Sequence, residues 1–206
     1  MVEIKGLFPT ALYVAELKNI MPSEIKKIMT IYEDKDKWKT NINNNFTSKE
    51  VYVFDNLLGN KSFLVNEIQH HINNYCEKIL GEKPALKPTQ SWLNFNPPGT
   101  SHHKHCHGNS IVSGVLYFKT TPKSGALVLH KREFFTIKNS TINNTTFNND
   151  IYRVFPKEHT LILFPSSLEH SVDNNESDET RISLAFNTFY RDTIIGDEFN
   201  LTGLKV

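Results

Sequence analysis

The sequence predicts a mainly β protein, a β-sandwich or barrel with helices packed on one of its sheets. Two observations support this fold class. Two segments within the first 80 residues carry apolar side chains at helical spacing, whereas the chain after Pro88 consists of short runs rich in β-branched and aromatic residues. The predicted order is therefore two helices followed by about eight short strands, which is typical of sandwiches and barrels.

Length and composition favour a single folded domain over residues 1–206. The chain has 206 residues, 38% of them hydrophobic, which is enough for one sizeable core. A helical region at about 20–85 should pack on the β part. The formal net charge of +1 gives no reason to expect nucleic acid or a membrane surface as a partner. No signal peptide or membrane span is visible, and with only Cys76 and Cys106 no disulfide framework is expected, so we predict a cytoplasmic protein.

The N-terminal part should begin with a strand and a helix. Residues 7–17 alternate loosely between apolar and polar side chains, which predicts an early strand. A helix should start at Pro22, because proline is favoured in the first turn. Residues 33–61 are polar and should form loops around a short strand at 51–54. The buried face of the first helix is predicted to contain Ile25, Ile28, Met29 and Tyr32.

A second helix is predicted over residues 62–80. Gly81 follows it directly and can end the helix in a left-handed conformation. Cys76 should be a small core residue of this helix rather than a reactive thiol. Its apolar stripe consists of Leu64, Ile68, Ile72, Tyr75 and Ile79.

The remainder of the chain should form the sheets. One stretch, 131–153, is rich in Asn and Thr, has no sustained period, and is predicted to be a long excursion such as a flap. Residues 173–180 are polar and should form a hairpin loop. The predicted strands lie at 91–96, 101–107, 111–118, 125–130, 159–164, 168–172 and 181–190.

Four of the nine histidines fall within six positions, from His102 to His107. In a strand, residues two apart point to the same face, so His103, His105 and His107 should share a face and His102 should point away. Neutral imidazole suits Fe, Zn, Cu or Ni, and an adjacent pair needs only one more ligand from a neighbouring strand. Exposed histidine clusters also bind metals adventitiously. The residues alone leave the 103/105 pair and the 105/107 pair open.

A third histidine and an arginine follow much later in the chain. His170 is predicted on a short strand after a proline turn, and Arg181 and Ser183 begin the next strand. The guanidinium of an arginine is a planar fork of donors that matches a carboxylate. The chain thus carries, in this order, a His-x-His, a single His and an Arg-x-Ser.

This order resembles that of the 2-oxoglutarate/Fe(II)-dependent oxygenases. Members of that superfamily carry a His-x-Asp/Glu…His metal motif, followed by an Arg-x-Ser that binds the far carboxylate of 2-oxoglutarate. Within it, the chain is similar to a prolyl-hydroxylase-like family of bacterial and phage proteins. The similar segments, from residue 7 to about 190, are LFPT at 7–10, SWLN at 91–94, HCH at 105–107, SGVLY at 113–117, LFPS at 163–166 with His170, and RISLAFN at 181–187.

The resemblance implies a double-stranded β-helix, which is a jelly roll of the cupin-like kind. It implies Fe(II) held by His105, His107 and His170. The 105/107 pair is preferred over 103/105 because its distance to Ser113 fits the family better. The second ligand is usually Asp or Glu, so a histidine there leaves the native metal open. The residues implied to bind the 2-oxoglutarate cosubstrate are Arg181, Ser183, Tyr117, Asn94 and Asn187.

The function implied is that of an oxidoreductase, a 2-oxoglutarate-dependent dioxygenase. Such a hydroxylase couples the oxidative decarboxylation of 2-oxoglutarate to succinate with hydroxylation of a substrate. The resemblance favours a peptide or protein substrate, and a homodimer stays open. Two alternatives remain from the residues themselves. One is a cupin-like three-His metalloprotein without 2-oxoglutarate chemistry, and the other is a non-catalytic jelly-roll interaction module.

Overall fold

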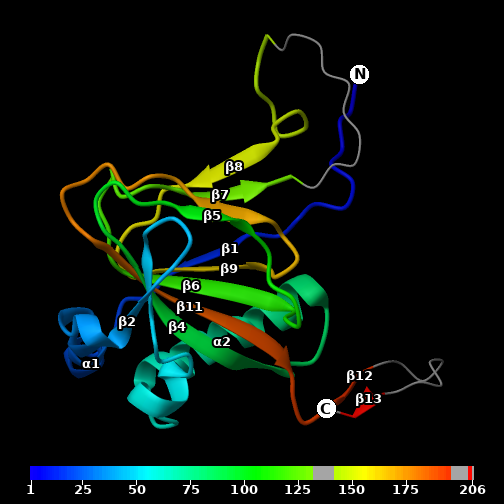
Figure 1. Cartoon of the computed structure of the whole chain (residues 1–206). Coiled ribbons are helices and arrows are strands. Elements are labelled where there is room, and N and C mark those ends of the chain that lie inside the picture. The colour runs from blue at the N-terminus through cyan, green and yellow to red at the C-terminus, as the bar shows by residue number, and fades with distance from the viewer. Residues whose placement is uncertain (132–141, 196–203, 206) are drawn as a thin grey trace.

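Two antiparallel sheets face each other in this computed structural model, which describes residues 1–131, 142–195 and 204–205. Figure 1 shows the smaller sheet lying over the larger one. The larger sheet has seven strands, in the spatial order β1 (Tyr13–Glu16), β9 (Thr160–Pro165), β6 (Val112–Lys119), β11 (Arg181–Tyr190), β4 (Leu86–Asn96), β3 (Phe46–Ser48) and β2 (Trp38–Thr40). The smaller sheet has the order β5 (His102–His105), β10 (His170–Val172), β7 (Leu127–His130) and β8 (Ile151–Val154). A short pair, β12 (Ile194–Ile195) and β13 (Leu204–Lys205), stands apart near the C-terminus.

The two predicted helices lie on the face of the larger sheet that is turned away from the smaller one (Figure 1). They are α1 (Pro22–Glu33) and α2 (Phe63–Tyr75), and α2 continues into a π-helical stretch, Cys76–Leu80, that ends at Gly81 with φ 70°. Cys76 is buried in the core, as predicted. The predicted stripe of α2 is buried as far as Tyr75, but Ile79 is 37% exposed because the π-helical stretch changes the spacing of the side chains.

A buried carboxylate ties the two helices together. Glu24 in α1 accepts hydrogen bonds from the Ser62 hydroxyl and from the backbone N–H of Leu64. Ser62 itself caps α2 by accepting a hydrogen bond from the N–H of Val65 at 3.1 Å. These contacts satisfy N–H groups at the start of α2 that have no partner within the helix.

The strand predicted at 51–54 is wrong. A π-helical turn, Val53–Leu58, replaces it, and only Tyr52 forms an isolated bridge, with Ser91. Val53 and Phe54 are buried in the core, and the N–H of Phe54 donates to the Ser91 hydroxyl at 2.8 Å. Apolar residues fit a buried turn as well as a buried strand, so this short run did not distinguish the two.

Strand alternation divides the central strands of the larger sheet into two faces. The outward side chains form the core beneath the helices; among them are Leu93, Phe95, Leu116, Ile182, Leu184 and Phe186. The inward side chains form a smaller core between the sheets; among them are Val115, Tyr117, Ile162 and Phe164, with Leu127 and Leu129 from β7. The polar residues that the sequence singles out on β4, β6 and β11 share this inward face.

The later strands match the prediction with some changes of bounds: β5, β7 and β10 are shorter than predicted, β4 is longer, β6 and β9 are shifted by one residue, and β11 agrees. The early strand covers only β1 rather than all of 7–17. Of the predicted excursion 131–153, residues 132–141 lie outside the described residues. Its end joins the smaller sheet as β8, which pairs with β7. Within the described residues, no helix combines the length and the apolar character needed to cross a membrane.

Candidate metal and cosubstrate site

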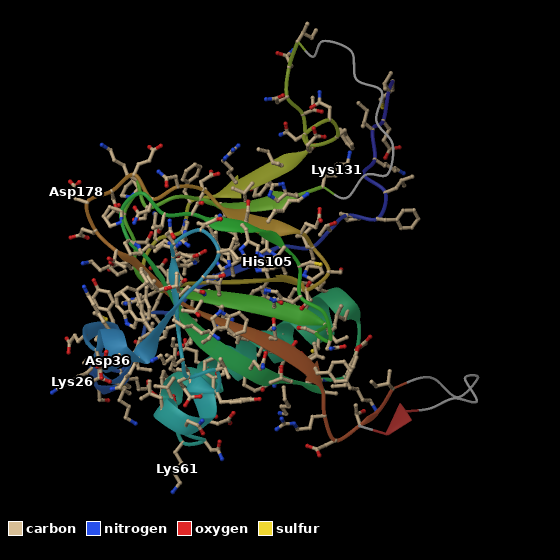
Figure 2. All side chains as sticks on the ribbon, in the orientation of Figure 1. Lys26, Asp36, Lys61, His105, Lys131 and Asp178 are labelled. Atoms are coloured by element: carbon tan, nitrogen blue, oxygen red, sulfur yellow. The ribbon has the colours of Figure 1, made fainter. Side chains whose placement is uncertain are left out.

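Three histidines converge between the two sheets. His105 ends β5 and pairs in register with His170 at the start of β10, while His107 follows two residues after β5. Figure 2 shows His105 in the layer between the sheets. One ligand atom from each of the three rings lies within 4.8 Å of the other two, and the Nε2 atoms of His105 and His107 are 3.1 Å apart.

Hydrogen bonds at Nδ1 determine which nitrogen of each ring carries the proton. Every one of the three Nδ1 atoms lies against an oxygen that accepts, so Nδ1 is protonated and Nε2 keeps a lone pair. These acceptors are the His103 carbonyl at 2.9 Å for His105, the Leu168 carbonyl at 2.9 Å for His170, and the Asn187 side-chain oxygen at 2.6 Å for His107. Nε2 lone pairs that approach this closely repel one another unless a cation lies between them. The donor set therefore fits a metal ion, with the Nδ1 contacts orienting each ligand.

The burial of the three rings keeps them in the form that binds metal. Desolvation is the largest cause in each case: it lowers the pKa of His170 to about 3 and also lowers the pKa of His105 and of His107. Neutral imidazoles therefore predominate at neutral pH, and no proton has to be displaced from Nε2.

Two details of the predicted histidine strand are wrong. β5 ends at His105, so His107 lies in the following turn, where its N–H donates to the Ser166 carbonyl at 2.9 Å. His102 does not point away from the cluster, because its ring stacks on that of His105 with centroids 4.8 Å apart. The pairing of β5 with β10 shifts register between these two histidines. One extra residue in β5 thus brings side chains three apart to the same face.

Two serine hydroxyl groups in a row are hydrogen-bonded to one another and to His107, and the sequence did not predict this contact. The Ser113 hydroxyl lies 2.8 Å from Nδ1 of His107 and donates to Asn187 Oδ1 at 2.8 Å. Ser166 lies 2.8 Å from Ser113, oxygen to oxygen. Asn187, expected among the cosubstrate-binding residues, thus contacts a histidine instead. Ser113 is the first residue of the SGVLY segment, and this was the one feature of the sequence that could have indicated its role.

The other predicted site residues line the same cavity as the three histidines. This cavity has a volume of about 50 Å³ and lies between the sheets. The predicted residues around it are His105, His107, His170, Asn94, Tyr117, Arg181 and Ser183. The fold thus brings to one cavity residues that are up to 89 positions apart in the chain, from Asn94 to Ser183.

Arg181 is a buried cation that has no counter-anion among the residues that the structure describes. It is 2% exposed, and it donates from Nη2 to Asn96 Oδ1 at 3.1 Å and from Nη1 to the Gly125 carbonyl at 3.3 Å. No carboxylate forms an ion pair with it in the described part of the chain, and its Nε has no hydrogen-bond partner there. Burial lowers the pKa of Arg181, but a guanidinium stays charged in proteins. Burial of an unpaired charge is unfavourable, so we expect an anionic ligand to bind beside Arg181.

Strand register places further polar atoms beside this arginine. Arg181 pairs with Asn96, and Ser183 pairs with Asn94 on one side and Tyr117 on the other. Asn94 Oδ1 and Asn96 Nδ2 are buried without a hydrogen-bond partner among the described residues. Burial raises the pKa of Tyr117, which keeps its phenol neutral, and the Arg181 guanidinium lies 5.7 Å from its ring centroid. Unsatisfied buried polar atoms gathered in one place fit a polar ligand such as a carboxylate.

Comparison with known families agrees with this geometry. A model of the family described as "Putative 2OG-Fe(II) oxygenase" matches residues 90–187, which include all the site residues named above. The match covers just under half of the chain and supports the 2-oxoglutarate/Fe(II)-dependent oxygenase superfamily. The chain is therefore an oxidoreductase that uses Fe(II) and 2-oxoglutarate, and the two non-oxygenase alternatives are set aside. No curated protein sequence matches the chain.

Solved structures show the same fold, the double-stranded β-helix. A prolyl-4-hydroxylase from Pseudomonas putida is 14% identical, with 88% of this chain and 94% of that chain covered and a TM-score of 0.55. HygX from Streptomyces hygroscopicus, solved with nickel, 2-oxoglutarate and hygromycin B, is 12% identical (87% and 82% covered, TM-score 0.55). A Trichoplax adhaerens prolyl hydroxylase in complex with a peptide fragment is 13% identical (87% and 83%, TM-score 0.57).

Proposed function

We propose that the protein is a hydroxylase in which His105, His107 and His170 hold Fe(II) through Nε2. Arg181 binds the far carboxylate of 2-oxoglutarate. One observation carries the assignment: a buried guanidinium, which has no anionic partner in the described part of the chain, lines the same cavity as three converging imidazole lone pairs. A metal site alone would explain the histidines but not the arginine.

When bound, Fe(II) and 2-oxoglutarate supply, with O₂, the chemistry that replaces a substrate C–H bond by C–OH and yields succinate and carbon dioxide. The residues of the chain bind and orient the metal ion and 2-oxoglutarate, and they exclude water from the site. Arg181 pairs with the carboxylate, and Asn94 and Tyr117 offer hydrogen bonds beside it. Apolar side chains of Val115, Leu127 and Phe164 close the cavity and limit the access of water, which strengthens each charged contact inside it.

All three proposed ligands are neutral, whereas the superfamily usually has a carboxylate at the second position. A neutral triad leaves the full charge of the divalent ion to be balanced by 2-oxoglutarate. The position of His107 is well suited to an imidazole, because Asn187 and Ser113 both contact its Nδ1. His107 is thus held in the site by the hydrogen bonds at its Nδ1.

We further propose a peptide or protein as the substrate. A second cavity of about 360 Å³ adjoins the first across Trp92, which lines both. Its other side chains and backbone belong to Lys39, Thr40, Asn41, Thr47, Ser48, Val51 and Gln90. Amide and hydroxyl groups of this kind can pair with the N–H and C=O groups of an extended peptide. The presence of prolyl hydroxylases among the similar structures supports the same choice.

The proposal is tested with the full chain, purified without a histidine tag and loaded anaerobically with Fe(II). Fe(II) with 2-oxoglutarate should raise the melting temperature more than Fe(II) alone, because a ligand that binds only the folded state stabilises it. Admission of O₂ should then convert 2-oxoglutarate to succinate, and peptide libraries can be screened for a mass gain of one oxygen. A protein that gains no stability from millimolar 2-oxoglutarate and forms no succinate would refute the assignment.

A further inference from the structure

A second group of three imidazoles lies beside the first. One ligand atom from each of His102, His103 and His105 lies within 4.8 Å of the other two, the same limit that holds for the first group. Their ring centroids are 4.8 to 5.0 Å apart, compared with 4.3 to 5.1 Å among His105, His107 and His170. The two groups are therefore equally compact, and they share His105.

Two buried atoms, one in this second group and one beside it, lack hydrogen-bond partners in the described part of the chain. Nδ1 of His103 has no hydrogen bond among the described residues, although it is shielded from water. Asn45 is fully buried beside His102, with its Nδ2 3.4 Å from Nδ1 of that ring, and the Oδ1 of this amide also has no partner in the described chain. Unsatisfied buried nitrogen and oxygen atoms around a group of imidazoles are the surroundings that a metal ion would complete.

We propose that His102, His103 and His105 form a second position for a transition-metal ion, which is alternative to the first. The two positions exclude each other because His105 has one free nitrogen. Its Nδ1 is protonated and donates to the His103 carbonyl at 2.9 Å, so only Nε2 can bind a metal. Rotation about side-chain torsions is enough to turn these rings toward one ion, since their ligand atoms are already close.

This inference rests on the proposed function only because that function assigns His105, His107 and His170 as the first metal position. The second position should show itself in variants that lack a ligand of the first. Loss of His107 should leave the ion bound by His102, His103 and His105, in a position that lacks His107 and His170. Such a protein would retain metal and yet lose turnover. Loss of His105 would remove both positions at once.

The test uses Co(II), which accepts imidazole ligands and is stable in air, with the full chain and no histidine tag. Binding is measured by equilibrium dialysis and by visible absorption. Wild type should bind one Co(II) per chain, and His107→Asn should also bind one, within about tenfold of the wild-type affinity. Adding His102→Gln and His103→Gln to His107→Asn should weaken binding by at least about a further tenfold. His130→Gln, a histidine in β7 outside both groups, is the matched control and should change nothing in either background.

Two results would overturn the proposal. One is a His107→Asn protein that binds no Co(II), and the other is a triple variant that binds as tightly as His107→Asn alone. Two ions per wild-type chain would refute the mutual exclusion. Circular dichroism shows whether each variant folds, and the single His103→Gln change in the His107→Asn background repeats the test with less disturbance. Failure of the proposed function would show differently, as a wild-type protein that binds Co(II) but forms no succinate with Fe(II).

Discussion

Asn187 accepts a hydrogen bond from Nδ1 of His107 over 2.6 Å, although the two residues are 80 positions apart in the chain. The same oxygen accepts the Ser113 hydroxyl at 2.8 Å. This contact holds the proton on Nδ1 of His107 and leaves Nε2 free for a metal ion. An amide on β11 thereby controls a proposed ligand in the turn after β5.

In a His102→Gln, His103→Gln background, which lacks the second metal position, replacing Asn187 by Ala should weaken Fe(II) or Co(II) binding by about 10- to 100-fold, the usual effect of removing the hydrogen-bond partner of a ligating histidine. The reason is the loss of the oxygen that selects the tautomer and fixes the ring. Affinity can be measured by equilibrium dialysis on the folded variant. Asn144→Ala, on an exposed residue that does not line the cavity, serves as the control. Unchanged affinity in Asn187→Ala would mean that Ser113 alone orients the ring.

Arg181→Ala should raise the half-saturating concentration of 2-oxoglutarate by at least about 30-fold while metal binding persists. Removing one partner of a buried charge pair costs roughly 2–5 kcal/mol, and each 1.4 kcal/mol is about a factor of ten. Arg181→Lys should recover only part of the affinity, because an ammonium cannot form two parallel hydrogen bonds. The readout is O₂-dependent succinate formation at varied 2-oxoglutarate.

The control for that change is Arg153→Ala, which removes an exposed arginine paired with Asp173 at 2.9 Å. Exposed ion pairs contribute little, so this variant should behave as wild type. An Arg181→Ala protein that saturates at the wild-type concentration of 2-oxoglutarate would remove the arginine from the cosubstrate site.

The metal-free protein should lose stability as the pH falls below about 6.5. Burial lowers the pKa of His102 and of His170 from 6.5 to about 3. Between these values the unfolded chain binds protons that the folded chain does not, so the free energy of unfolding falls as the pH falls. At pH 5 each ring accounts for about 2 kcal/mol, at 1.36 kcal/mol per pH unit.

Urea unfolding of the metal-free protein at pH 7.5 and pH 5 measures this difference. The double variant His102→Gln, His170→Gln should show a clearly smaller loss over the same interval, because the glutamine side chains do not titrate. Equal losses in the wild type and in the double variant would show that other groups cause the acid sensitivity.

Gly114→Ala should destabilise the fold. A Cβ atom at this position would lie 2.1 Å from the ring of Phe186, which is fully buried beneath the helices. Overpacking of this kind costs about 1–3 kcal/mol, and each kcal/mol lowers the melting temperature of a chain this long by about 2–4 °C. Gly108→Ala is the matched control, because nothing lies within 4 Å of its added Cβ. Equal melting temperatures for the two variants would mean that Phe186 moves aside freely.

Local patterns were enough to predict the fold class, both helices and most strands. The family resemblance singled out Asn94, Tyr117 and Arg181, and the alternation along β4, β6 and β11 turns their side chains toward the cavity between the sheets. Where a pattern was short, it failed. Residues 51–54 are apolar, as in a buried strand, yet they lead into a π-helical turn. Their side chains only need to be buried, and a turn buries them as well as a paired strand would.

The sequence by itself determined the kind of groups that meet, namely imidazoles, an arginine and amides at spacings that suit a sheet. Only the tertiary structure decided how they meet. An extra residue in β5 turns His102 toward His105, strand pairing brings His170 beside His105, and the distant amide of Asn187 selects the tautomer of His107. The physical reason is that side-chain direction within a strand follows from local geometry. Register shifts and hydrogen bonds between residues 60 to 80 positions apart depend instead on how whole strands pair and pack.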